Sequence, residues 1–77
     1  MSNKDKLKEI INEVLEGKGG NTVSSISDTD KLRDDIGLDS FDLAELTVRI
    51  EESFDVDVFS DGIIETVSEI LEKIDAK

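Results

Sequence analysis

The chain has 77 residues, of which 20 are acidic and 9 basic, so its formal net charge is −11, and it contains neither cysteine nor histidine. This length predicts one small domain over residues 1–77, with a modest core and no disulfide or Cys/His metal site to support it. The negative charge disfavours nucleic acid and anionic membranes and favours basic partners, although an acidic surface also simply keeps small proteins soluble.

The first predicted element is an amphipathic helix over residues 3–16. Ser2 or Asn3 can cap its start, and Gly17 followed by Gly19-Gly20 ends it. Its apolar residues recur at the three- and four-residue spacing of one helix face. They are Leu7, Ile10, Ile11, Val14 and Leu15.

Residues 17–39 form the next segment and show no sustained periodicity. A connection of this length is unusual in a compact domain and is often functional. We expect several of its apolar residues to cover the helices as a lid on the core. These residues are Val23, Ile26, Leu32, Ile36 and Leu38.

Two further helices are predicted in the second half of the chain. Asp39 and Ser40 can cap a helix over roughly residues 40–53, and Thr66-Val67-Ser68-Glu69 is a capping box that starts the last helix near residue 66. Between them, residues 54–65 contain Gly62 and leave room for one short helical turn. The fold class is therefore all-α: a small bundle of three main helices with room for a short fourth, and a long loop between the first two.

The second helix carries two apolar faces. The core face consists of Leu43, Leu46, Ile50 and Phe54, and the opposite stripe consists of Phe41, Ala44 and Val48. Acidic residues border this stripe, which gives it the apolar centre and charged rim of a docking surface for a basic partner. The alternative is that Phe41 lies under the long loop and that Val48 is an isolated surface residue.

Ser40 stands at the start of the second helix, directly after a loop that contains Gly37. Unpaired amides and the helix dipole favour an anion there, so a phosphate ester on Ser40 would be well placed. The simpler alternative is that Asp39 or Ser40 only caps the helix.

Catalytic and metal-binding motifs fail on inspection. Without histidine there is no base for a serine triad, and the acidic segments 28–33 and 55–60 fail the calcium-loop pattern. We therefore interpret Ser40 as an attachment point and predict no catalytic or metal-binding residues.

From Lys31 to Ile74 the sequence resembles the acyl carrier proteins, and the first helix resembles them more loosely. The resemblance rests on Leu32-Arg33-Asp34-Asp35-Ile36-Gly37-Leu38-Asp39-Ser40, on Glu45-Leu46, on Ile50-Glu51-Glu52-Ser53-Phe54 and on Thr66-Val67. It implies that a phosphopantetheinyl transferase attaches the 4′-phosphopantetheine of coenzyme A to Ser40, next to Asp39. The thiol of this arm would hold cargo as a thioester, and the chain itself would catalyse nothing.

The resemblance also implies roles for residues around Ser40. Acids of the second helix would steer basic patches of partner enzymes towards the stripe of Phe41, Ala44 and Val48. These acids are Asp39, Asp42, Glu45, Glu51 and Glu52. If cargo folds back between the helices, the candidate lining residues are Leu46, Ile50, Ile64 and Val67.

Three features differ from the usual fatty-acid carrier. Phe41 follows the serine where those carriers usually have leucine, and it resembles D-alanyl and some specialised carriers. The segment before the last helix looks short and contains Gly62, which weakens the case for a full third helix and a large acyl cavity. Arg49 adds a positive charge beside the docking stripe.

We therefore expect a cytoplasmic, monomeric carrier that serves loading ligases, synthases and transferases of fatty-acid or specialised lipid or secondary-metabolite biosynthesis. One alternative is an aminoacyl, D-alanyl or peptidyl carrier loaded by an adenylating ligase. Another, of a different class, is an unmodified acidic helical module that binds a basic protein. The chain has no apolar run long enough for membrane insertion and no signal-peptide stretch after Met1.

Overall fold

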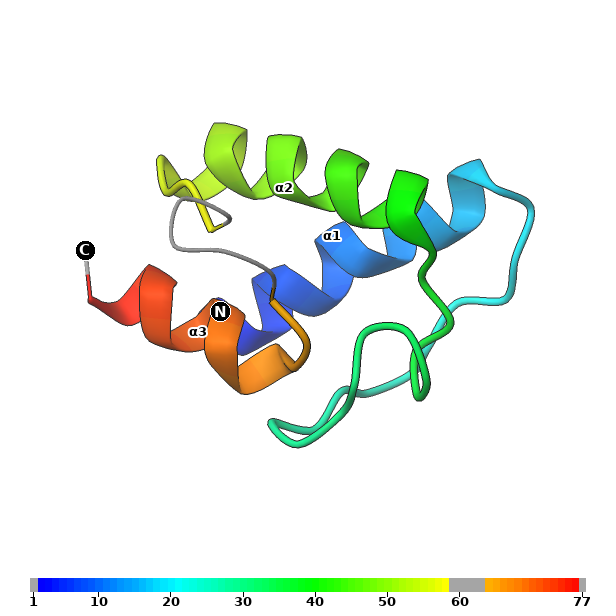
Figure 1. Cartoon of the computed structure of the whole chain (residues 1–77), viewed down its shortest axis with the longest axis horizontal. Coiled ribbons are helices and arrows are strands. Elements are labelled where there is room, and N and C mark those ends of the chain that lie inside the picture. The colour runs from blue at the N-terminus through cyan, green and yellow to red at the C-terminus, as the bar shows by residue number, and fades with distance from the viewer. Residues whose placement is uncertain (1, 59–63, 77) are drawn as a thin grey trace.

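The computed structural model describes residues 2–58 and 64–76, and its described part consists of three helices and their connections (Figure 1). The helices are α1 (Asn3–Gly17), α2 (Ser40–Phe54) and α3 (Val67–Asp75). No strand occurs in these two ranges. The all-α prediction is confirmed, and each helix begins or ends within about one residue of its predicted position.

The helix ends follow from short polar and glycine signals. Ser2 Oγ accepts a hydrogen bond from the backbone of Asp5 at 3.1 Å and caps α1. At the other end Gly19 has φ +79°, a left-handed conformation that glycine adopts without steric cost, and Gly20 N–H donates to the carbonyl of Leu15 at 2.9 Å. The side chain of Thr66 caps α3, as the capping-box pattern predicts.

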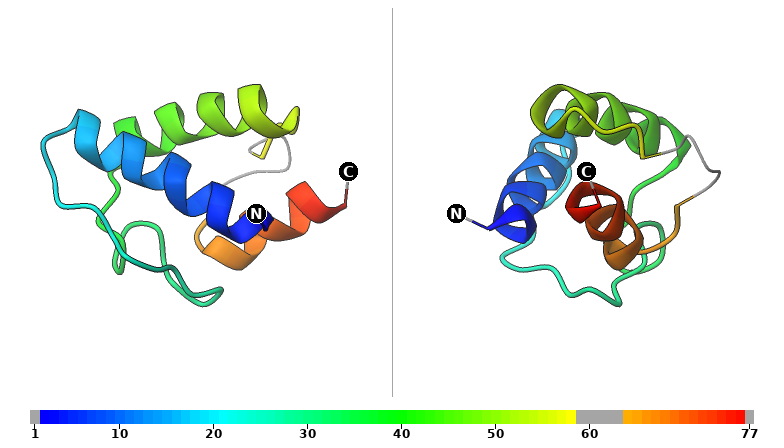
Figure 2. Two further views of the ribbon diagram at one scale, coloured as in Figure 1. Left: turned by 180° about the vertical axis from the view of Figure 1, so that it is seen from behind. Right: turned by 90° about the vertical axis from the view of Figure 1, so that its left-hand side faces the viewer.

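The three helices surround one core. α1 packs against both α2 and α3, and α1 and α2 run in opposite directions (Figure 1). The end-on view in Figure 2 shows all three helices around a common centre. The buried core residues of the helices are Leu7, Ile10, Ile11, Val14, Leu15, Leu43, Leu46, Ile50, Val67, Ile70 and Ile74.

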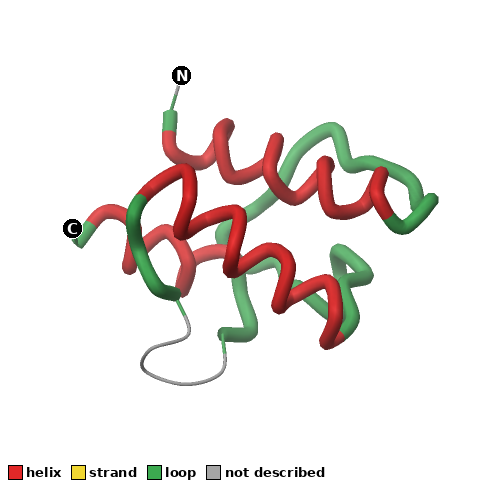
Figure 3. The backbone as a smooth tube through the Cα atoms, turned by 90° about the horizontal axis from the view of Figure 1, so that it is seen from above, coloured by secondary structure: helices red, strands yellow, loops and turns green. Residues whose placement is uncertain are grey.

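The long connection, residues 18–39, closes the bundle as the sequence predicts. Ile26, Leu32 and Leu38 are buried in the same core as the helices, and Val23 and Ile36 pack against it. The loop starts at the end of α1 and returns to the start of α2 on the same side of the molecule (Figure 3).

Between its ends, the loop reaches the start of α3. Leu32 N–H donates to the carbonyl of Glu65 at 2.8 Å, and Val67 N–H donates to the carbonyl of Asp30 at 3.1 Å. Ser68 N–H likewise donates to Asp28 at 2.9 Å. The loop is therefore ordered by long-range backbone pairing, although it has no regular secondary structure of its own.

The short fourth helix expected between residues 54 and 65 falls largely on residues 59–63, which lie outside the described residues, as does Gly62. α2 ends at Asp55, which adopts the left-handed conformation with φ 58°, and residues 55–57 are not helical. None of α1, α2 and α3 combines the length and the hydrophobicity that crossing a membrane requires.

Candidate functional site at the start of α2

The start of α2 is capped by Asp39. Its Oδ1 accepts a hydrogen bond from Asp42 N–H at 2.9 Å, and Asp42 Oδ2 accepts one from Asp39 N–H at 3.1 Å. This reciprocal pair is a capping box. Because the carboxylate of Asp39 supplies the cap, the hydroxyl of the exposed Ser40 is not needed for it. Of the two caps that the sequence left open, the structure selects Asp39.

Among the described residues Ser40 has one side-chain partner, which the sequence analysis did not identify. Arg33 Nη2 donates a hydrogen bond to Ser40 Oγ at 2.8 Å. Arg33 lies in the turn at residues 31–36, where Asp35 and Ile36 N–H both donate to the carbonyl of Lys31. The sequence alone assigns Arg33 no contact with Ser40, because a loop residue has no periodicity that would indicate the direction of its side chain.

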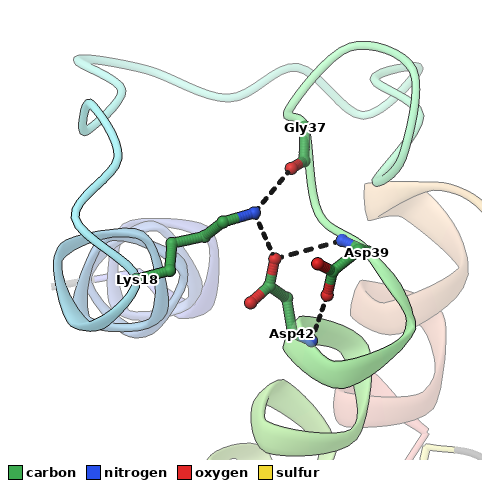
Figure 4. A network of polar contacts seen from close by, with 4 residues as sticks. All are labelled: Lys18, Gly37, Asp39 and Asp42. Atoms are coloured by element: carbon green, nitrogen blue, oxygen red, sulfur yellow. Dashed lines mark hydrogen bonds and ion pairs between the residues drawn. The ribbon is translucent and has the colours of Figure 1, made fainter.

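A polar network joins the end of α1 to the start of α2 (Figure 4). Lys18 Nζ lies 2.6 Å from Asp42 Oδ2 and 3.3 Å from the carbonyl oxygen of Gly37. Gly37 has φ +94°, which favours glycine, and it turns the chain into α2. Lys18 therefore binds both the chain reversal at Gly37 and the first helical turn of α2.

The hydrogen bond between Lys18 and Asp42 favours the charged form of each partner. It lowers the pKa of Asp42 below its usual value, and the capping bond with Asp39 acts in the same direction. It raises the pKa of Lys18 above its usual value. Both groups are therefore ionised at neutral pH.

The structure corrects the predicted role of Asp42 in docking. The sequence analysis placed it among the acids that meet a partner, but only 8% of the residue is exposed, and its carboxylate contacts Lys18 and Asp39 N–H. A helical wheel gives the angle of Asp42 on its own helix and contains no information about Lys18. Asp42 stabilises the start of α2 through these two contacts and does not belong to the exposed acidic rim.

The predicted docking stripe and the other predicted docking acids are exposed. Phe41 is 88% and Val48 55% exposed, so the long loop does not cover them. Ala44 is exposed between them on the same face. The other predicted acids are also exposed: Asp39, Glu45, Glu51 and Glu52.

Arg49, the positive charge beside this stripe, is held by acids. It lies 2.8 Å from Glu13 on α1 and 3.2 Å from Glu45 one turn earlier on α2. Its charge is therefore compensated locally, and the bridge to Glu13 links the two helices.

The four predicted cargo-lining residues lie in the core. Leu46, Ile50, Ile64 and Val67 are each at most 3% exposed. Ile64 also borders a surface pocket of about 370 Å³, together with Lys31, Arg33, Asp34 and Glu65. The pocket and Ser40 therefore share one neighbour, Arg33.

Comparison with known proteins gives consistent matches over nearly the whole chain. Residues 5–74 match the model of the phosphopantetheine attachment site. An acyl carrier protein of Trieres chinensis is 38% identical over 69 residues, which cover 87% of this chain and 86% of the relative. An acyl carrier protein of Desulforapulum autotrophicum is 37% identical over 79 residues, which cover 100% and 99% of the two chains.

The chain belongs to the acyl carrier protein family of phosphopantetheine-binding domains. It is a non-catalytic carrier that other enzymes use as a substrate, and its prosthetic group is covalent 4′-phosphopantetheine. The start of α2 fits the phosphodiester of this group, because it combines an exposed hydroxyl, a helix N-terminus and a guanidinium 2.8 Å from that hydroxyl.

Proposed function

We propose that Ser40 is the attachment residue and that the chain carries acyl groups as thioesters on the thiol of the attached arm. The observation that carries this proposal is the cap geometry of α2: Asp39 caps the helix, and Ser40 keeps an exposed hydroxyl. The family match also spans this position. The arm supplies a thiol to a chain that has no cysteine.

The chain's own part in loading is to present the serine oxygen. Ser40 Oγ would form the new bond to the phosphorus of coenzyme A that bears the pantetheine. The bond from this phosphorus to the bridging oxygen of the pyrophosphate would break, adenosine 3′,5′-bisphosphate would leave, and the proton of the hydroxyl must pass to a base of the transferase. Arg33 cannot take this proton, because a guanidinium is already fully protonated and has no acceptor site. A base other than Arg33 must therefore accept the proton, and in this proposal the transferase supplies it.

We propose that partner enzymes dock on the exposed face of α2. Phe41, Ala44 and Val48 provide the apolar contact, and Asp39, Glu45, Glu51 and Glu52 provide the charge that steers a basic surface. The partners are the phosphopantetheinyl transferase, loading ligases, and synthases or transferases. We propose a monomeric, cytoplasmic carrier with residues 1–77 as its single domain. The net charge of −11 opposes self-association and so supports the monomer.

Acyl groups of fatty-acid or specialised lipid or secondary-metabolite synthesis are the proposed cargo. If an acyl chain folds back, it would meet Leu46, Ile50, Ile64 and Val67, and Ile64 is the one that borders the pocket. Phe41 favours a second candidate, an aminoacyl, D-alanyl or peptidyl carrier, because a phenylalanine directly after the serine resembles the D-alanyl carriers. The activated acid that a ligase transfers to the loaded carrier distinguishes the two.

The first experiment is an intact-mass measurement before and after incubation with coenzyme A and several broad-specificity transferases. Wild type should gain one phosphopantetheine, and peptide mapping should place it on Ser40. Ser40→Ala should gain none and should keep its helical circular dichroism, because Asp39 still caps α2. No gain by wild type with any transferase would favour the unmodified interaction module.

A further inference from the structure

Arg33 differs from Lys18 and Arg49, two cations that form ion pairs with acids of α2. Lys18 is paired with Asp42, and Arg49 with Glu13 and Glu45. Within residues 2–58 and 64–76, by contrast, no carboxylate lies within ion-pair distance of Arg33, although the chain has 20 acidic residues. Its guanidinium contacts the neutral hydroxyl of Ser40 instead. The positive charge of Arg33 is therefore not compensated by an acid of the described chain.

A phosphodiester on Ser40 would match this guanidinium in charge and shape. The ester carries one negative charge and two non-bridging oxygens, and a guanidinium presents several N–H donors in one plane that can bind such a pair. The N-terminus of α2 adds a positive potential on the same side. In the unloaded chain, the distance of 2.8 Å already places Nη2 beside the atom to which phosphorus would be bonded.

We propose that Arg33 binds the phosphodiester of the loaded carrier and so restrains the first atoms of the arm. This inference rests on the proposed attachment at Ser40. Arg33 also lines the pocket of about 370 Å³ that Ile64 and Glu65 border just before α3. Binding of the phosphodiester by Arg33 therefore keeps the start of the arm beside this pocket. Arg33 is a positioning residue, because it restrains the position of the arm and takes no part in a chemical step.

The test is phosphorus and side-chain nitrogen NMR of the fully loaded carrier, with loading verified by intact mass. Arg33→Gln removes the charge, Arg33→Lys keeps a charge without the planar fork, and Arg49→Gln is a control with the same change in net charge as Arg33→Gln. The phosphorus resonance should shift in Arg33→Gln, shift less in Arg33→Lys, and stay at the wild-type position in Arg49→Gln. Added salt should move the wild-type resonance towards that of Arg33→Gln.

The second measurement needs no variant. The Nε–Hε resonance of Arg33 should shift when wild type is loaded, whereas that of Arg49 should not. An unchanged Arg33 resonance, or the same phosphorus position in wild type and loaded Arg33→Gln, would overturn the proposal and leave attachment at Ser40 intact. Failure of wild type to load, or loading at another residue, would instead defeat the proposed function.

Discussion

At the scale of single residues, neighbouring polar side chains around Ser40 have different tasks. Asp39 caps α2, and Asp42 completes the capping box and pairs with Lys18. Arg33 contacts the hydroxyl of Ser40. These four residues fix the surroundings of Ser40. The serine itself can change chemically without loss of the cap, because Asp39 supplies the cap.

The Lys18–Asp42 pair predicts a specific pH dependence of stability. Because the folded-state pKa of Asp42 lies below its unfolded value of about 3.9, its contribution is present above that pH and is lost as the pH falls through the folded-state pKa. The pKa of Lys18 is raised, so its contribution persists up to about pH 10 and is lost above it. Lys18→Met should therefore be less stable than wild type at pH 7, with a difference that disappears in acid.

Urea unfolding of wild type and Lys18→Met from pH 7 to pH 2 measures this difference. Asp42→Asn and the double variant complete the cycle and separate the pair from other effects of each substitution. If the difference between wild type and Lys18→Met were the same at pH 2 as at pH 7, the ion pair would not be its cause.

At the scale of elements, α2 has two faces with different functions. Leu43, Leu46 and Ile50 attach it to the core, while Phe41 and Val48 point to solvent. A phenylalanine that is 88% exposed contributes almost nothing to folding by burial. Its presence next to Ser40 is understandable if another protein covers it, as the proposed docking face requires.

Reversal of one charge on this face should slow docking. Glu52 is exposed near the apolar stripe, so Glu52→Lys should lower the rate constant for association with the transferase and reduce its salt dependence. Glu9→Lys on α1 makes the same change in net charge at another exposed site and is the control. Stopped-flow experiments at several salt concentrations measure the association rate constants of both variants. Equal decreases in the two would mean that net charge, and not a docking face on α2, determines the association rate.

At the scale of the whole molecule, α1 is the element that both other helices share, and the loop completes the core. The two ends of the described chain also meet, since Asn3 Nδ2 donates to Asp75 Oδ1 at 2.8 Å. Among the described residues no buried side-chain nitrogen or oxygen lacks a hydrogen-bond partner. A small protein without disulfides depends on a well-packed core and on hydrogen-bond partners for its buried polar groups.

Truncation in the core should therefore be costly. Ile50 is fully buried, and Ile50→Ala should lower the free energy of unfolding by about 2–5 kcal/mol. Val48→Ala, on the exposed face of the same helix, should change it by less than about 0.5 kcal/mol. Denaturant unfolding of both variants measures the contrast, and similar losses would mean that the two faces of α2 are misassigned.

Much of this architecture is predictable from the sequence. Apolar spacing and caps are local signals, so the limits of α1 and α2 and the start of α3 follow from them. That loop residues such as Leu32 and Leu38 cover the core follows from their hydrophobicity alone. Ser40 as a candidate site follows from its place at a helix start.

What could not be predicted depends on contacts between distant residues. Lys18 and Asp42 are 24 positions apart, and no periodicity relates them, so the sequence alone predicts that Asp42 is a surface acid. Arg33 reaches Ser40 only because the turn at residues 31–36 folds back. Asp39 and Ser40 are both good N-caps, and only backbone geometry distinguishes them.

The backbone pairing between the loop and the start of α3 has a consequence for the order in which the protein matures during synthesis. Residues 28–32 emerge from the ribosome well before their partners, residues 65–68. A nascent chain that already contains Ser40 therefore still lacks the partners that hold the segment next to Arg33. α3 contributes no side chain to the serine's hydrogen bonds, yet the serine reaches its final surroundings only after α3 has begun to form.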